Sequence, residues 1–380
     1  TTDSPDLSDC QSNWMDKIMK ELRKSERILN LASELMQYVS VNALYGGDIK
    51  SAINAITIIS EKMQYQLESI PTMEQREAMV MELAQSVTKT ASALLSAKNL
   101  PAWQDLPASQ QNRFLSNFIF ALERTGSLLP SALSPDKEVS ISSDNLLMTV
   151  RKISFRNIHR AHFPSAASLA TPIWRQYGDR VEVPALVLME NMDSEGSQVV
   201  FISLRNLEKI VAPSDRQAVN MRQVINSQVI HISFGDDVKP VIGEPLSVSF
   251  SHIGLVSSSS PQCVLWDSPT ESWSGYHCSI LTSNTTHTTC LCNRLGTYAL
   301  VESVEKDDGV ARMTFVVTVI IAISCSIVVF MSIILGFIYC FRTKVRESFH
   351  VLQCSHFQQL KALKSSKSLS TCCFYFSKKL

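Results

Sequence analysis

The chain has 380 residues, with 35 Lys and Arg, 35 Asp and Glu, and a formal net charge of zero. This length has room for one large domain or two ordinary ones with additional segments, and the balanced charge gives no reason to expect a nucleic-acid partner. No G-x-S-x-G, phosphate-loop or H-E-x-x-H motif occurs, so the common hydrolase, nucleotide-binding and metalloprotease classes have no support.

Three stretches in the first third of the chain have the apolar spacing of helices. The first follows a glycine turn with Asp48 as the expected N-cap. Its apolar residues recur every three or four positions: Ile49, Ile53, Ile56, Ile59 and Met63. The second begins at Thr72 with the spacing of a capping box, and the third runs from Ser109 to an expected stop at Gly126. Such stripes are typical of a bundle core, so we predict a helical subdomain over residues 13–135.

Beyond this subdomain the period changes to that of β-strands. Short runs rich in β-branched residues alternate with Asp, Ser, Gly and Pro turns, at residues 138–142, 147–153, 181–189, 198–204, 224–234 and 245–253. Many short strands without intervening helices indicate an antiparallel β-sandwich rather than a parallel sheet. The predicted fold class is therefore α+β, with the sandwich over residues 136–302.

An uncharged apolar segment at residues 313–340 follows a short linker over residues 303–312. A membrane helix needs about 20 apolar residues, so this segment can span a bilayer with some tilt. It also lacks the amphipathic face that would suit a buried helix of a soluble protein. We predict a single transmembrane helix, because no second apolar run of sufficient length occurs in the tail, residues 341–380.

The charges on either side of this segment predict its orientation. Eight Lys and Arg and one acid follow Cys340, whereas 27 of the 35 basic and 34 of the 35 acidic residues precede Met313. The positive-inside rule then places the tail in the cytoplasm and residues 1–312 outside a plasma membrane, with the lipid bilayer as a partner. No signal peptide opens the sequence, so we expect it to begin inside a longer protein.

Four of the five cysteines on the outer side fall within 30 residues: Cys263, Cys278, Cys290 and Cys292. Four clustered thiols suit either disulfides or a zinc ion, and an oxidising compartment favours disulfides. A Cys-x-Cys pair does not readily close on itself, so Cys290 and Cys292 should have partners elsewhere. Cys10 has no neighbour, and we expect its partner upstream or a free thiol.

Other candidate sites are few. His159 and His162 have no Cys, Asp or Glu beside them at ligand spacing, so no metal site is predicted, and we expect no cofactor. Asn284 begins an Asn-Thr-Thr sequon, which an extracellular position makes a plausible glycosylation site. The basic residues after the membrane segment suit anionic lipid headgroups or an ordinary cytoplasmic flank, and we favour the flank.

The stretch from residue 263 to residue 302 reads CVLWDSPTESWSGYHCSILTSNTTHTTCLCNRLGTYALVE. Its order is Cys-x-x-Trp with Trp266, a second tryptophan at Trp273, a lone cysteine, Cys-x-Cys and a short apolar strand. This order resembles the proteolysis-site (GPS) motif that closes the autoproteolysis-inducing (GAIN) domain of adhesion G protein-coupled receptors. SNTTHTTCLCN and parts of the helical region are similar to the latrophilin subfamily.

The resemblance implies a helical subdomain A, a β-sandwich subdomain B and the pairs Cys263–Cys290 and Cys278–Cys292. Residues 1–12 look like the end of the hormone-receptor module that precedes this domain in latrophilins. In the family the last strand is a tethered agonist that activates the seven-helix bundle when freed. That strand corresponds here to Gly296, Thr297, Tyr298, Ala299, Leu300, Val301 and Glu302. Glu302 stands where latrophilins carry an apolar residue.

The family cuts itself within a His-Leu-Thr or His-Leu-Ser tripeptide, where the His is a general base for the hydroxyl nucleophile. The corresponding residues here are Arg294, Leu295 and Gly296. Gly296 has no hydroxyl and Arg294 stays protonated, so we predict an uncleaved single chain. Use of Thr297 after a local slip stays open as an alternative.

These features predict the membrane-proximal part of a latrophilin-like adhesion receptor, truncated after its first transmembrane helix. Extracellular adhesion ligands and a G protein would be partners of the full-length receptor only. A single-pass adhesion or decoy product without G protein coupling is the alternative. An extracellular enzyme on a membrane stalk is a third hypothesis, and the absence of a catalytic motif disfavours it.

Overall fold

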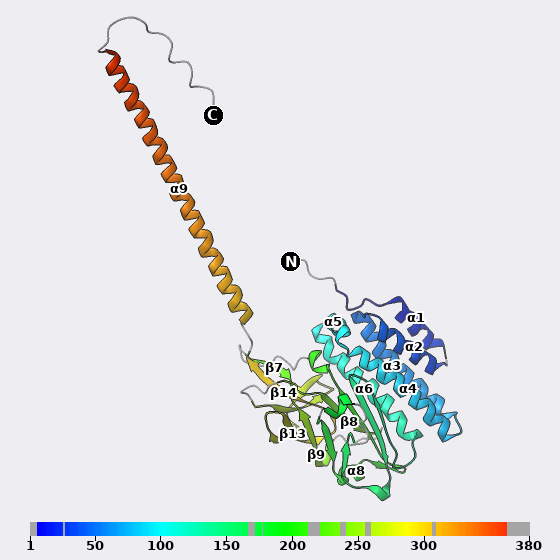
Figure 1. Cartoon of the computed structure of the whole chain (residues 1–380). Helices are drawn as coiled ribbons and strands as arrows, with labels where there is room; N and C mark the ends of the chain where they lie inside the picture. Colours follow the sequence, from blue (N-terminus) through cyan, green and yellow to red (C-terminus); the bar gives the residue numbers. More distant parts are fainter. Residues whose placement is uncertain are drawn as a thin grey trace. The chain divides into compact units, whose positions relative to one another are not determined.

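A computed structural model describes residues 6–25, 27–165, 172–176, 178–211, 221–235, 241–254, 260–305 and 309–362 of the chain. The chain divides into two compact units, Thr1–Lys306 and Asp307–Leu380. The first unit consists of helices followed by antiparallel strands, and the second contains one long helix (Figure 1). The predicted fold class is confirmed.

The first unit opens with a helical subdomain. Its helices are α1 (Asn13–Lys24), α2 (Ile28–Val41), α3 (Gly46–Glu68), α4 (Met73–Leu94), the 3₁₀ turn η1 (Ala97–Asn99), α5 (Leu100–Gln104) and α6 (Ala108–Ala132). Ile49, Ile53 and Ile56 are at most 3% exposed, as the helical spacing predicts. The Thr72 hydroxyl accepts a hydrogen bond from the backbone N–H of Gln75, so the predicted cap of α4 is present.

The predicted N-cap of α3 is wrong by three residues. Tyr45 precedes the helix, and Asp48 lies in its first turn with its carboxylate accepting from the Tyr45 backbone N–H at 3.1 Å. The same buried carboxylate accepts from the backbone N–H and the hydroxyl of Ser12, each at 2.8 Å. Asp48 therefore joins the starts of α1 and α3, because it satisfies donors that neither helix can satisfy internally.

The predicted stop at Gly126 is also wrong, because α6 continues to Ala132. A Cβ at Gly126 would lie 2.6 Å from Cγ1 of Val200, a residue of the sheet beneath the helix. The glycine is needed for close approach of the helix to the sheet rather than for a left-handed C-cap. The helix continues through it because packing on the sheet outweighs the roughly 1 kcal/mol cost of an interior glycine.

Two antiparallel sheets follow. The larger contains β1 (Glu138–Ser142), β2 (Leu146–Ile153), β5 (Met192–Asp193), β6 (Gly196–Leu204), β7 (Met221–Ile225), β8 (Val229–Phe234), β10 (Gln262–Asp267), β11 (Ser272–Ser274) and β14 (Gly296–Glu305). The smaller contains β3 (Ala161–Phe163), β4 (Arg180–Val183), β9 (Val241–Ser251), β12 (Cys278–Ser283) and β13 (His287–Arg294). The strand order of the larger sheet is β1-β2-β6-β8-β14-β10-β11, and in addition β5 pairs with β6 and β7 pairs with β14. The order of the smaller sheet is β12-β13-β9-β4-β3.

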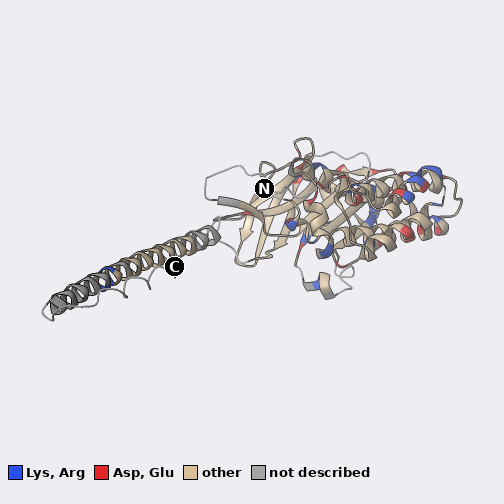
Figure 2. Ribbon diagram, turned by 90° about the horizontal axis from the view of Figure 1, so that it is seen from above, with Lys and Arg blue, Asp and Glu red and all other residues tan. Residues whose placement is uncertain are grey.

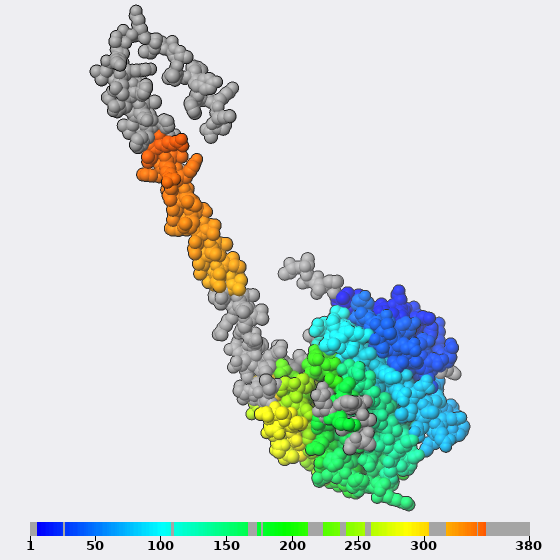
Figure 3. All heavy atoms as spheres, in the orientation of Figure 1, coloured from blue at the N-terminus to red at the C-terminus, as the bar shows by residue number. Residues whose placement is uncertain are grey.

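Two cores give this unit three layers. One core lies between the two sheets and includes Phe163, Phe201 and Phe250. The other lies between the helices and the outer face of the larger sheet, where α4 and α6 pack against β2 and α6 also packs against β6 and β8. The space-filling view shows the helical residues, blue to cyan, in continuous contact with the green strand region (Figure 3).

Two expected boundaries differ from the structure. Residues 181–189 were predicted as one strand-like run, but β4 ends at Val183 and α8 occupies Ala185–Glu190. Pro184 separates the two elements, and proline disfavours continuation of a ladder while it suits a helix start. The expected linker at residue 303 is also partly strand, because β14 continues to Glu305 in pairing with β7.

The second unit contains helix α9 (Gly309–Ala362). Its segment Val317–Arg346 is the one helix, among the described residues, that is long and apolar enough to cross a membrane. The hydroxyls of Ser324, Ser326 and Ser332 donate to backbone carbonyls one turn earlier, so these polar groups need no water. Lys and Arg gather toward the C-terminal part of its described length (Figure 2).

We predict that Gly126→Ala destabilises the first unit. Overpacking against Val200 should cost about 1–3 kcal/mol, which exceeds the roughly 1 kcal/mol that alanine gains in helix propensity. Thermal and urea unfolding of the full chain would measure the loss. The double variant Gly126→Ala/Val200→Ala should lose less stability than the sum of the losses of the two single variants, because the smaller side chain at position 200 leaves room for the added methyl group. Losses that add exactly would contradict the contact.

A second prediction concerns Asp179, whose carboxylate accepts from the backbone N–H of Ser251 and is 7% exposed. Burial raises the pKa of Asp179 to about 6, against the backbone and side-chain hydrogen bonds from Ser251, which lower it. The folded chain therefore binds more protons than the unfolded chain between about pH 4 and 6, and this group makes the free energy of unfolding fall as pH rises through that window. Asp179→Asn should remove that component. Chemical unfolding between about pH 4 and 7 would measure this dependence. If the free energy of unfolding varied with pH in the same way for the variant and the wild type, the raised pKa of Asp179 would be contradicted.

Candidate functional site

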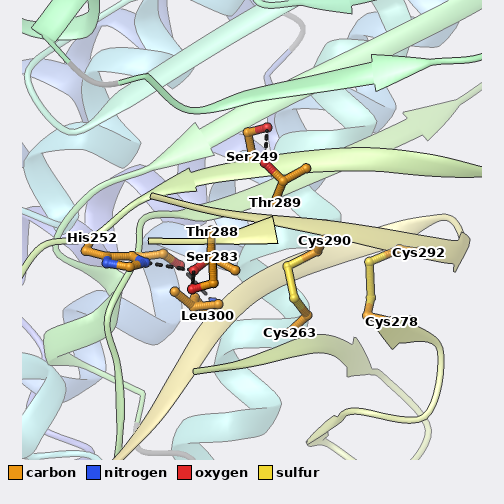
Figure 4. Close-up of a disulfide and its surroundings, with 11 residues drawn as sticks. Ser249, His252, Cys263, Cys278, Ser283, Thr288, Thr289, Cys290, Cys292 and Leu300 are labelled. Carbon is orange, nitrogen blue, oxygen red and sulfur yellow. Dashed lines mark hydrogen bonds between the residues drawn. A yellow bond between two sulfur atoms is a disulfide. The ribbon is translucent and has the colours of Figure 1, made fainter. Parts of the chain in front are cut away.

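The four clustered cysteines form two disulfides at the end of the sandwich. Cys263 of β10 is joined to Cys290 of β13, and Cys278 of β12 is joined to Cys292 of β13 (Figure 4). These are the pairs that the resemblance implies. The first bond connects the two sheets across their core, and the second joins residues that face each other in one ladder. Among the described residues Cys10 and Cys325 are free.

The two motif tryptophans lie on neighbouring strands. Trp266 of β10 and Trp273 of β11 are paired in the ladder, and their rings meet edge to face with centroids 5.1 Å apart. The indole N–H of Trp266 donates to the hydroxyl of Ser116 on α6 at 2.9 Å. Trp266 therefore links the cysteine-rich end of the sandwich to the helical subdomain.

Strand β14 is an inner strand of the larger sheet and is buried on both faces. It pairs with β10 on one side and with β8 and then β7 on the other. Tyr298 and Leu300, both 0% exposed, enter the core between the sheets, whereas Ala299 and Val301 enter the core beneath the helices. The alternation follows from the two-residue period of a strand.

Glu302 is buried as well, at 2% exposed. Its carboxylate accepts a hydrogen bond from the side-chain amide of Asn226 at 2.9 Å. The Asn226 side-chain oxygen in turn accepts from the backbone N–H groups of Ile253 and Gly254. Asn226 lies between β7 and β8. The polar cluster therefore holds β14 at the place where its pairing passes from β8 to β7.

The tripeptide Arg294-Leu295-Gly296, called the degenerate tripeptide from here on, lies at the turn from β13 into β14. The guanidinium of Arg294 lies 3.6 Å from the carboxylate of Asp267. Gly296 has φ +147°, a backbone conformation that side-chain-bearing residues rarely adopt, and a Cβ there would approach Leu265 to 3.2 Å. Gly296 carries no hydroxyl, and an arginine guanidinium is not a proton acceptor.

Tyr298 closes this turn. Its buried hydroxyl donates to the backbone carbonyl of Arg294 at 2.6 Å. Burial raises the pKa of Tyr298 far above its usual value, although the Gly296 backbone acts to lower it, so the phenol stays a neutral donor. The ring thus holds the turn from inside the core.

The structure adds two residues that the sequence analysis did not single out. The Thr297 hydroxyl lies 2.9 Å from Nδ1 of His231 on β8, directly opposite it in the ladder. Nε2 of His231 lies 3.7 Å from the carboxylate of Glu123 on α6. A histidine between the two isoleucines of β8 was a detectable signal, but nothing distinguished Glu123 from other charged helix residues.

The remaining candidates are exposed. The Asn284 side-chain oxygen accepts from the backbone N–H groups of Thr286 and His287, which forms a tight turn around the sequon. His162 lies 3.7 Å from Glu182, an ion-pair distance. Within the part of the chain that the structure describes, no group of three or more His, Cys, Asp or Glu could hold a metal ion.

Comparison with known proteins agrees with these features. A family model described as AGRL2-4 GAIN subdomain A matches residues 13–129, and one described as GPS, GAIN subdomain B, matches residues 137–306. Latrophilin Cirl of Drosophila mojavensis is 28% identical over 92% of this chain, and that of Drosophila persimilis is 29% identical over 79%. The chain spans 22% and 19% of those proteins.

A solved structure, the full extracellular region of zebrafish Gpr126/Adgrg6, is 17% identical, with a TM-score of 0.43 over 68% of this chain and 35% of that one. The fold and the two family models define a GAIN domain with a GPS motif. The chain belongs to the adhesion G protein-coupled receptors of latrophilin type, a family of plasma-membrane receptors rather than enzymes.

We predict that Tyr298→Phe destabilises the first unit by about 1–3 kcal/mol, because the backbone carbonyl of Arg294 loses the hydrogen bond donated by the Tyr298 hydroxyl. Chemical unfolding of the full chain would measure the change. Tyr276→Phe is the matched control, since Tyr276 is 88% exposed. Equal stability of the two variants would contradict the role given to the hydroxyl.

Proposed function

We propose that this chain is the membrane-proximal part of a latrophilin-type receptor in which β14 serves as a tethered agonist inside an uncleaved GAIN domain. In the complete receptor, adhesion ligands outside the cell and a G protein inside it would be the partners. The observation that carries the proposal is the burial of Tyr298, Ala299, Leu300 and Val301 on both faces of β14. A strand buried in this way is hidden until the domain opens.

The proposed orientation rests on the charges at the end of the apolar segment of α9. Arg342, Lys344 and Arg346 lie at the C-terminal end of its apolar segment, which supports a cytoplasmic tail. The disulfides and the exposed sequon at Asn284 suit the opposite, oxidising side. The first unit is therefore proposed to be extracellular.

The chemistry at the turn supports an intact peptide bond between Leu295 and Gly296. Gly296 has no side chain to attack the preceding carbonyl, and Arg294 cannot accept a proton at physiological pH. Thr297 carries a hydroxyl, but it is 3% exposed and engaged with His231 on the neighbouring strand. Signalling without cleavage would then require opening of the sandwich, not loss of a precut strand.

Glu302 distinguishes the proposed agonist from an apolar peptide. Moving β14 into an apolar receptor pocket would separate the Glu302 carboxylate from Asn226, and an unpaired buried carboxylate is costly. We therefore expect the segment from Thr297 to Val301 to carry the agonist function. The activity should be weaker when Glu302 also has to enter the receptor pocket.

The test of the uncleaved state is expression of the full chain in secreting cells, followed by a denaturing gel and N-terminal sequencing of any fragment. We expect one band. Arg294→His alone and Gly296→Thr alone should also give one band, because each variant lacks either the nucleophile or the base. Any fragment that begins at position 296 should appear only when both substitutions are combined.

Two wild-type bands would contradict the proposal, and sequencing would identify the bond that breaks. A fragment beginning at Gly296 would show that the family's bond is cut despite the missing hydroxyl. A fragment beginning at Thr297 would show that its hydroxyl acts as a displaced nucleophile.

A further inference from the structure

A cavity of about 320 Å³ lies between α6 and the larger sheet, beside the turn into β14. Residues of α6, β8 and β10 and the degenerate tripeptide line it. Ligand sites in proteins usually occupy about 300–1,000 Å³ and combine an apolar lining with a few convergent polar groups. The cavity has the size of a site for a small organic molecule.

The polar end of the cavity is formed by Glu123 and His231. The side chain of Glu123 is 33% exposed, and its carboxylate lies 3.7 Å from Nε2 of His231. A glutamate carboxylate is ionised at neutral pH. Among the described residues no Lys or Arg forms an ion pair with Glu123, whereas Arg294, the cation in the lining, is paired with Asp267.

His231 provides an independent sign of a ligand. Its ring is 5% exposed, and Nε2 has no hydrogen-bond partner in the structure. The distance of 3.7 Å from Nε2 to the Glu123 carboxylate is too long for a direct hydrogen bond. When Nδ1–H donates to the Thr297 hydroxyl, Nε2 is an acceptor, so a donor placed between Nε2 and the carboxylate would satisfy both groups.

The rest of the lining is suited to an apolar body. Ile119, Trp266, Pro269 and Leu295 provide apolar surface, and the ring of Phe120, 51% exposed, is a large apolar side chain in the same lining. Aromatic rings beside a carboxylate favour ammonium ions over anions, because the ring faces carry negative potential.

From these features we infer that the cavity is a binding site for a small primary ammonium ion with an apolar body, of aralkylamine type. The ammonium group donates to the Glu123 carboxylate and to Nε2 of His231, and the apolar body lies against Trp266 and Leu295. The ligand contacts α6 and the start of β14 together, so its binding stabilises the closed position of the strand.

The inference is tested by calorimetric titration of the full chain in lipid nanodiscs, with empty nanodiscs as the blank. The probe is 2-phenylethylamine, and its neutral and anionic analogues are 2-phenylethanol and 3-phenylpropionate. We expect the amine to bind, and we expect the alcohol and the acid to bind at least about tenfold more weakly. The alcohol has no positive charge to pair with Glu123, and the carboxylate of the acid is repelled by it.

Glu123→Gln keeps the shape of the site and should weaken amine binding by about tenfold or more. Glu74→Gln is the matched control, because Glu74 is an exposed acid in the first turn of α4, outside the cavity. Thermal unfolding of both variants establishes that they are folded. Absence of amine binding, equal binding of the three probes, or unchanged affinity in a folded Glu123→Gln variant would each overturn the inference.

Discussion

The double-sided burial of β14 is the constraint on which the rest of the first unit depends. Alternate residues of this strand enter different cores, with Tyr298 and Leu300 between the sheets and Ala299 and Val301 beneath the helices. An inner strand of this kind needs a sheet on one side and helices on the other to keep both faces from water. The helical subdomain therefore covers one of the two faces of β14.

Polar groups at the interfaces around β14 restrict how these layers can fit together. Trp266 hydrogen-bonds Ser116 of α6, His231 contacts Thr297, and Asn226 holds Glu302. A buried polar group is costly without its partner, so a shift of the strand or of α6 by one residue would leave several of these groups unsatisfied. The apolar cores supply most of the stabilisation, and the polar pairs select one register.

The disulfides act at the same place. Cys263–Cys290 connects the strand next to β14 with the opposite sheet, and Cys292 lies two residues before Arg294. Bonds of this kind typically contribute about 2–4 kcal/mol by restricting the unfolded chain. The turn that carries the degenerate tripeptide is therefore held at both ends, by a disulfide on β13 and by the buried ring of Tyr298 on β14.

Local periodicity was enough to predict the helical subdomain, most strands of the sandwich and the apolar span, because each depends on the spacing of residues close in sequence. The motif residues 263–302 likewise identified the family. The tertiary structure alone decided that Gly126 lies against Val200, that a short helix begins directly after Pro184 and that Glu123 faces His231. The contacts of Gly126 and Glu123 join segments far apart in the chain, and the short apolar run at residues 181–189 fits a strand or a helix equally well. Only the packing of the helices and sheets together selects between such alternatives.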